Sequence, residues 1–177
     1  MSYTEIFKFN SRGKAEGIGE TPNAWRGAMA VWNILDEKYL PPFFPKWGTP
    51  GETYHRTSCD MGTNTIIREI WELANDDRVS DIDKIVLGTT FDNVIVMSKD
   101  IPKLVNAFYE FEGETSLKEQ AGIIERALAD DPKLMAIGWN QTSVCDDAWV
   151  VYDKRDRSRP YNIKKDTKHW SLFENID

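Results

Sequence analysis

The chain has 177 residues, of which 41% are hydrophobic and 29% charged, and its formal net charge is −7 at pH 7. This length suits one domain with a sizeable core, and the composition is that of an ordinary globular protein without low-complexity tracts. No apolar run reaches the roughly 20 residues of a membrane helix, and residues 1–10 lack the basic and apolar regions of a signal peptide. We therefore expect a cytoplasmic protein whose two cysteines, Cys59 and Cys145, are reduced.

The first 40 residues predict a hairpin followed by a helix. Residues 4–10 alternate in polarity and residues 15–20 contain glycine, so we expect these two segments to pair. Thr21 and Pro22 are typical of a helix start, and the pattern predicts a helix over residues 21–40. Its apolar stripe keeps helical spacing at Trp25, Ala28, Met29, Trp32, Leu35 and Tyr39. We expect the two indole rings of this stripe to lie in the core.

Residues 41–62 hold four prolines and three glycines and show no periodicity. An aperiodic stretch of this length in a small domain is usually either functional or a flap. The next apolar stripe predicts a helix that opens at Thr63 or Asn64. Two β-branched runs, residues 84–89 and 94–98, then read as a second hairpin.

The remaining elements complete a mixed fold. We expect helices with Pro102 in the first turn of one and Ser116 as the cap of the next, then strands over residues 134–139 and 149–152. Residues 166–174 predict a short closing helix. The sum is an α+β fold, with a mostly antiparallel sheet of five or six short strands packed with four or five helices. We assign residues 1–152 to one domain and residues 153–177 to a basic C-terminal segment packed on it.

Charge is unevenly distributed along the chain. Residues 66–147 contain 17 acidic and 8 basic residues, whereas residues 153–169 contain seven Lys or Arg and three Asp. An acidic body with a basic segment would steer basic partners to one face and anionic partners to another. The alternative is that this charge serves solubility alone.

The familiar catalytic motifs are missing. The sequence has no phosphate-binding loop, no strand-linked G-x-G-x-x-G, no G-x-S-x-G and no H-E-x-x-H. Phosphate-loop nucleotide hydrolysis and Rossmann redox chemistry are therefore not expected. A zinc site would have to use His55, Cys59, Cys145 or His169, and only His55 and Cys59 are close in sequence. We predict no metal site from this set.

The most unusual polar stretch lies between two tryptophans. Trp139 and Trp149 flank a run of hydrogen-bonding side chains, Asn140, Gln141, Thr142 and Ser143. Aromatic surface beside amides is typical of a recognition loop, in which rings stack and amides read the partner. The alternative is a tight connection whose polar side chains bond the local backbone while both rings pack inward.

A catalytic cluster is a second interpretation of the same region. Asp146 and Asp147 could hold Mg²⁺ or Mn²⁺, and His169 could shuttle a proton near neutral pH. Neighbouring residues on a strand face opposite ways, so the pair would converge only at a turn. Cys145 with His169 could likewise form a nucleophile and base. The plainer alternative is that His169 belongs to a packed closing element.

Four segments resemble a group of small proteins from phages and mobile elements of Gram-positive bacteria. They are N-A-W-R-G-A-M-A-V-W at residues 23–32, T-T-F-D-N-V-I-V-M-S-K-D-I-P-K-L at 89–104, W-N-Q-T-S-V at 139–144 and R-P-Y-N-I-K-K-D-T-K-H-W at 159–170. Proteins of this size and source include anti-CRISPR inhibitors of Cas9-type nucleases. The resemblance therefore implies, as a hypothesis, a counter-defence role in the cytoplasm of a bacterial host, and it assigns no role to any residue.

Two functions follow as hypotheses. In the first, the acidic body, including Glu110, Glu112 and Glu114, occupies the nucleic-acid channel of a basic host protein, such as a CRISPR nuclease or its complex with guide RNA. In the second, the protein is a small metal-dependent nuclease acting on RNA or DNA. The basic segment, including Arg157 and Arg159, would then follow the phosphate backbone toward the acidic pair and His169.

Overall fold

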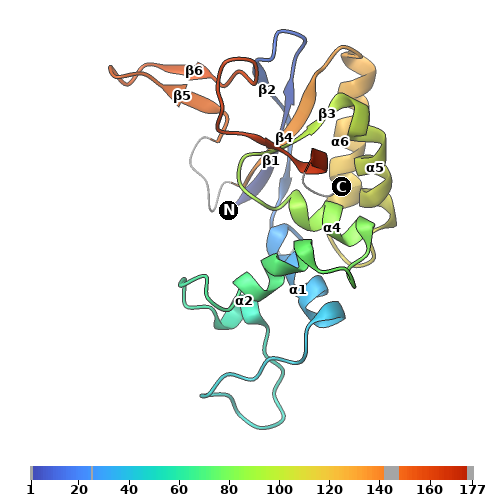
Figure 1. Cartoon of the computed structure of the whole chain (residues 1–177), viewed down its shortest axis with the longest axis vertical. Helices are drawn as coiled ribbons and strands as arrows, with labels where there is room; N and C mark the ends of the chain where they lie inside the picture. Colours follow the sequence, from blue (N-terminus) through green and yellow to red (C-terminus); the bar gives the residue numbers. More distant parts are fainter. Residues whose placement is uncertain (1, 25, 142–147, 175–177) are drawn as a thin grey trace.

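The computed structural model describes residues 2–24, 26–141 and 148–174. Within these ranges it confirms the α+β fold with a mostly antiparallel sheet (Figure 1). The main sheet has the order β2-β1-β4-β3-β7, in which only the β3–β7 pair is parallel among the described pairings. Its strands are β1 (Tyr3–Phe9), β2 (Ala15–Pro22), β3 (Val94–Met97), β4 (Ala136–Gln141) and β7 (Trp170–Ser171). A separate hairpin pairs β5 (Val150–Tyr152) with β6 (Ser158–Pro160).

The helices gather on one face of the main sheet and below it in the view of Figure 1. They are α1 (Ala28–Tyr39), α2 (Arg56–Cys59), α3 (Arg68–Trp71), α4 (Asp81–Gly88), α5 (Ile101–Glu110) and α6 (Leu117–Asp130). Short 3-10 turns, η1 (Glu72–Asn75), η2 (Ser98–Asp100) and η3 (Leu172–Glu174), join or end these elements. No helix in the described ranges is long and apolar enough to cross a membrane.

Both faces of the sheet are covered. Ile6 and Phe9 lie three positions apart on β1 and therefore point to opposite faces. Ile6 belongs to the large core beneath the helices, whereas Phe9 packs in a smaller cluster with Trp149 and Tyr161. The ring centroids of Phe9 and Trp149 are 5.0 Å apart, with the rings edge to face. The C-terminal part of the chain thus covers the second face of the sheet.

The first hairpin is confirmed, but the helix that follows begins later than predicted. Thr21 and Pro22 continue β2 and pair with β1, so α1 starts at Ala28 rather than at residue 21. Thr21 is fully buried and does not cap the helix. Trp32 is only partly buried, and Trp25 lies outside the described residues. The buried positions of α1 are Val31, Leu35 and Asp36.

The predicted strand over residues 84–89 is wrong, because residues 84–88 belong to helix α4 and Thr89 is its C-cap. The Ser80 hydroxyl accepts a hydrogen bond from the Asp83 N–H at 3.2 Å, which caps the helix at its start. The predicted strand at residues 94–98 is confirmed as β3, but it pairs with β4 and β7 instead of forming a hairpin. The predicted closing helix is replaced by β7 and the short turn η3.

The helices α5 and α6 agree with their apolar patterns. Pro102 lies in the first turn of α5, and α6 begins directly after Ser116. The predicted capping hydrogen bond is absent from this described helix end. Instead, the Ser116 hydroxyl accepts a hydrogen bond from the Gln120 side chain at 2.9 Å.

Candidate functional site

Residues 41–67, which we call the lobe, extend away from the sheet below α1 (Figure 1). Pro41 and Pro42 follow the end of α1, where they prevent the helix from continuing. The lobe contains helix α2 and exposes three large apolar side chains. Phe44 is 56% exposed, Trp47 65% and Met61 86%. A projecting segment that exposes such side chains is typical of an interaction surface.

The base of the lobe is tied to α1 through Arg56, which is only 4% exposed. Its guanidinium donates to Asp36 of α1, to Glu69 at 2.8 Å and to the Pro41 carbonyl at 3.1 Å. The Arg56 N–H also donates to the second carboxylate oxygen of Asp36 at 3.2 Å. A charge this buried must be fully paired, so the arrangement holds the lobe in one position on α1.

A second carboxylate organises the C-terminal end of the lobe, next to α3. Asp60 accepts the backbone N–H groups of Thr63, Asn64, Ile66 and Ile67 at 2.8–3.1 Å. The hydrogen bond from Ile67 is the largest cause that lowers the pKa of Asp60 below its usual value, against a smaller opposing effect of desolvation. The carboxylate therefore stays charged and fixes the turn that leads into α3.

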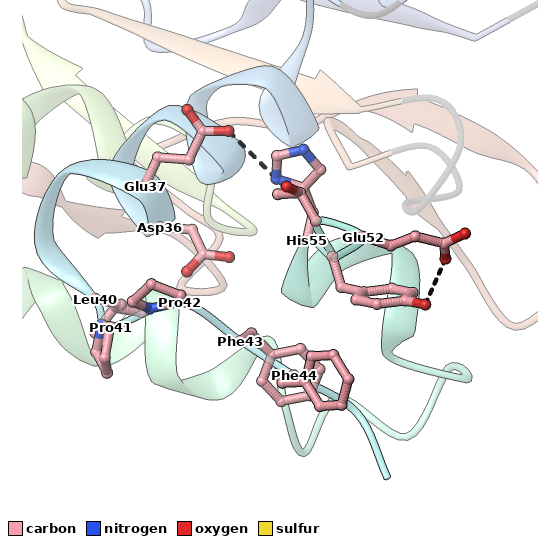
Figure 2. A pocket seen from close by; sticks show the side chains of 11 residues that line it. Asp36, Glu37, Leu40, Pro41, Pro42, Phe43, Phe44, Glu52 and His55 are labelled. Atoms are coloured by element: carbon pink, nitrogen blue, oxygen red, sulfur yellow. Dashed lines mark hydrogen bonds and ion pairs between the residues drawn. The ribbon is translucent and has the colours of Figure 1, made fainter. Parts of the chain in front are cut away.

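A pocket of about 310 Å³ lies where the lobe meets the end of α1 (Figure 2). One wall consists of residues from α1, and the other of lobe residues. Its lining residues are Asp36, Glu37, Leu40, Pro41, Pro42, Phe43, Phe44, Glu52, Thr53, Tyr54 and His55. The pocket therefore combines apolar and aromatic walls with three carboxylates.

The aromatic wall is built around Tyr54. Its ring lies edge to face with Phe44, with centroids 5.8 Å apart, and with Trp47 at 5.3 Å. The Tyr54 hydroxyl donates to Glu52 and accepts the Thr49 N–H, both at 2.6 Å. These contacts connect the exposed rings to the backbone of the lobe, so the rings form one surface.

The described part of the predicted recognition loop, from Trp139 to Trp149, does not line this pocket. Trp139 and Trp149 are 4% and 1% exposed, so both rings pack inward. Their indole N–H groups donate to Gln120 at 3.1 Å and to the Trp139 carbonyl at 2.9 Å, respectively. Thr142 lies outside the described residues.

The two amides of this predicted set also bond within the protein. The side-chain N–H of Asn140 donates to Glu5 at 2.8 Å, and the side-chain Oε1 of Gln141 accepts from the Thr4 hydroxyl at 2.7 Å. Asn140 is 6% exposed, and its side-chain oxygen has no hydrogen-bond partner among the described residues. The stretch therefore joins β4 to β1 through its amides.

Of the predicted catalytic set, His169 lies within the described residues, whereas Cys145, Asp146 and Asp147 lie outside them. The Tyr161 hydroxyl lies 2.8 Å from His169 Nδ1. Burial lowers the pKa of His169 below its ordinary value, although Asp166 and Glu174 act in the opposite direction. His169 thus packs beside Tyr161 at the edge of the smaller core.

No three His, Cys, Asp or Glu side chains in the described part of the chain are grouped so that they could hold a metal ion. Cys59 is buried, and burial raises the pKa of its thiol. His55, which is close to Cys59 in sequence, instead faces Glu37, with Nδ1 3.5 Å from the carboxylate.

The predicted charged residues lie on opposite sides of the molecule. Glu110, Glu112 and Glu114 are exposed at the end of α5 and in the connection to α6, where Gly113 approaches Ile34 of α1. The β5–β6 hairpin projects from the other side (Figure 1). The predicted binding residues of this basic segment each pair with a local carboxylate: Arg157 with Asp153 and Arg159 with Asp166, both at 2.6 Å.

Apart from His55, which the sequence offered only as a zinc ligand, the pocket residues were not among the candidate residues derived from the sequence. The signal that indicated them was the long aperiodic stretch rich in proline and glycine, which lacks the periodicity needed to assign individual side chains. Comparison of the chain with models of protein families, with characterised proteins and with solved structures finds no significant match. The functional argument therefore depends on the site itself.

Proposed function

We propose that this protein is a binding protein whose lobe engages a basic, nucleic-acid-handling host protein, in a counter-defence role such as inhibition of a CRISPR nuclease. The observation that carries the proposal is the exposure of Phe44, Trp47 and Met61 on a segment anchored by the buried Arg56. Large apolar side chains exposed on a projection favour association with another protein.

The character of these side chains supports protein binding. Aromatic residues and methionine are enriched at interfaces, and a few such residues usually supply most of the binding energy. Arg56 fixes the base of the lobe, and Asp60 fixes the turn into α3. Tyr54 contacts the rings of Phe44 and Trp47, so little ordering remains to be done when a partner binds. Anchored aromatic side chains of this kind therefore suit a binding role.

The charge of the body supports a basic partner. The net charge is −7, and exposed carboxylates such as Glu110 and Glu112 lie beside α1, from which the lobe extends. A channel that holds nucleic acid is lined with Lys and Arg, so an acidic surface can compete for it. Binding should weaken with salt, since exposed charges are screened over about 10 Å at 0.1 M ionic strength.

The test uses a purified Cas9-type nuclease, with and without guide RNA, and measures binding by biolayer interferometry and inhibition in a DNA-cleavage assay. We expect the natural protein to bind and inhibit the nuclease. Phe44→Ser/Trp47→Ser should bind at least about tenfold more weakly, because a few hot-spot residues usually supply most of the binding energy. Tyr152→Ser is the matched control, because Tyr152 is 54% exposed but lies on the distant β5.

Three results would contradict the proposal. The natural protein could fail to bind the nuclease at low salt, or the lobe variant could bind as tightly as the control. The third is cleavage of RNA or single-stranded DNA by the protein in Mg²⁺ or Mn²⁺ that is lost in His169→Ala. That outcome would favour a metal-dependent nuclease instead.

A further inference from the structure

We propose that the pocket between α1 and the lobe binds an arginine side chain of the partner protein. The inference deepens the proposed function and rests on it for the source of the arginine. It is carried by one juxtaposition: the carboxylates of Glu37 and Glu52 and the aromatic rings of the lobe line the same cavity (Figure 2).

The balance of charge in the pocket favours a cation. Three carboxylates line it, and no lysine or arginine is among its lining residues in this fully described part of the chain. Asp36 is already paired with Arg56 from below, so one of the three charges is offset within the protein. Glu37 and Glu52 are exposed, and their described contacts are with His55 and with the neutral Tyr54 hydroxyl. Two of the lining carboxylates are thus not paired with a lysine or arginine among the residues that line the cavity.

The aromatic walls favour the same ligand. Phe43, Phe44 and Tyr54 line the cavity, and a cation over the face of an aromatic ring is attracted by the ring quadrupole. The protein already uses this contact at the base of the lobe, since the Arg56 guanidinium lies 5.2 Å from the centre of the Phe43 ring. Apolar walls with carboxylates therefore suit a flat cation with an apolar stem better than a hydrated metal ion.

The size and the geometry favour arginine in particular. A volume of about 310 Å³ is at the lower end for ligand pockets and admits one long side chain rather than a helix or strand. A guanidinium can stack on a ring while its N–H groups reach a carboxylate, whereas an ammonium is compact and more strongly hydrated. A protein that holds nucleic acid presents many arginines on its surface.

The experiment titrates the ¹⁵N-labelled protein with short blocked peptides, Gly-Arg-Gly, Gly-Lys-Gly and Gly-citrulline-Gly, and follows amide shifts by NMR. Citrulline has nearly the shape of arginine but no charge. We expect the arginine peptide to shift the amide resonances of residues 36–55. It should bind about fivefold or more tightly than the citrulline peptide, because one cation–π contact and two exposed ion pairs depend on its charge. The lysine peptide should bind more weakly than the arginine peptide.

Charge-removing variants test the same point without a change in shape. Glu37→Gln/Glu52→Gln should lower the affinity for the arginine peptide by about fivefold, since exposed ion pairs each contribute a modest amount of binding free energy. Glu125→Gln/Asp130→Asn, at exposed positions of α6, is the control and should leave the affinity for the arginine peptide unchanged. Equal binding of the citrulline or lysine peptide, shifts outside the pocket, or no binding at all would overturn the inference.

The two proposals fail in distinguishable ways. If the nuclease binds and Phe44→Ser/Trp47→Ser weakens it, but Glu37→Gln/Glu52→Gln changes neither nuclease nor peptide binding, the inference is wrong and the proposed function stands. If the arginine peptide binds in the pocket and the nuclease does not bind, the pocket assignment stands and the proposed function is wrong.

Discussion

The guanidinium of Arg56 and the carboxylate of Asp36 form a buried ion pair that joins the lobe to helix α1. Removing one partner leaves the other charge buried without compensation, which typically costs about 3–5 kcal/mol. We therefore predict that Arg56→Met lowers the free energy of unfolding by about this amount, measured by urea denaturation. Arg68→Met, at an exposed position of α3, should change it by less than about 0.5 kcal/mol.

A double substitution tests whether the loss of stability comes from an unpaired buried charge. In Asp36→Leu/Arg56→Met both charges are replaced by apolar groups of similar size, so most of the lost stability should return. A double variant as unstable as the sum of the single variants would show that the two side chains act independently.

The buried carboxylate of Asp83 should make the free energy of unfolding depend on pH in the acid range. Burial by itself would raise the pKa of Asp83, but hydrogen bonds from Lys38, Tyr39 and Ser80 outweigh it, and the pKa lies below its usual value. The carboxylate therefore stabilises the fold above the unfolded-state pKa of about 4. This contribution is lost as pH falls through the folded-state pKa.

We accordingly predict that Asp83→Asn lowers the free energy of unfolding at pH 7 by about 1–3 kcal/mol, as for a charged group with several buried hydrogen bonds. The difference from the natural protein should shrink below pH 4. Chemical denaturation at pH 7 and pH 3 measures it, and an equal difference at both values would contradict the assignment.

Replacing glycine by alanine at two positions should change the stability of the fold in opposite directions. At Gly138 of β4 an added Cβ would lie 2.8 Å from the Trp149 ring and 3.1 Å from Phe9, both fully packed. Overpacking of this kind costs about 1–3 kcal/mol, so Gly138→Ala should destabilise the fold. At Gly122 of α6 an added Cβ would lie 3.6 Å from the Arg126 side chain, an ordinary contact distance. Gly122→Ala should stabilise the fold by up to about 1 kcal/mol through helix propensity.

Thermal unfolding of both variants tests this pair. The same sign for both would contradict the packing described around Trp149. Because Trp149 lies on the face opposite the helices, the comparison also tests whether the C-terminal part of the chain covers the sheet.

Elements with a strong local period were predictable, and those set by distant contacts were not. The alternation of β1 and the apolar stripes of α5 and α6 match the observed elements because one face of each is buried. Thr21 and Pro22 look like a helix start, yet pairing with β1 draws them into β2. The β-branched run of α4 suggested a strand, although the spacing of Ser80 and Asp83 is a capping signal that favours a helix.

The candidate site was indicated only as a region. The sequence marks residues 41–62 as unusual, but nothing local shows that Arg56 would meet Asp36, 20 residues earlier, and so fix the aromatic wall. The polar run flanked by Trp139 and Trp149 predicted a recognition loop instead. Both rings are buried, because β4 lies at the centre of the sheet and has covered faces on both sides.

The hydrogen bond between Tyr161 and His169 carries the last prediction. The Tyr161 hydroxyl accepts the backbone N–H groups of Lys168 and His169 at 2.8 and 3.1 Å. Its own proton is therefore directed to Nδ1 of His169, 2.8 Å away, and this nitrogen must be unprotonated to accept it. The bond favours the neutral ring, in the same direction as burial, which lowers the pKa of His169.

Tyr161→Phe removes that donor and leaves the ring position filled, so the pKa of His169 should rise toward its ordinary value. An NMR pH titration measures it directly, since the chain has only two histidines. Because the folded-state pKa is lowered, the natural protein should lose stability as pH falls through about 6.5, and the variant should lose less. A His169 pKa that stays unchanged in Tyr161→Phe would show that the hydroxyl proton is directed elsewhere and that burial alone keeps the ring neutral.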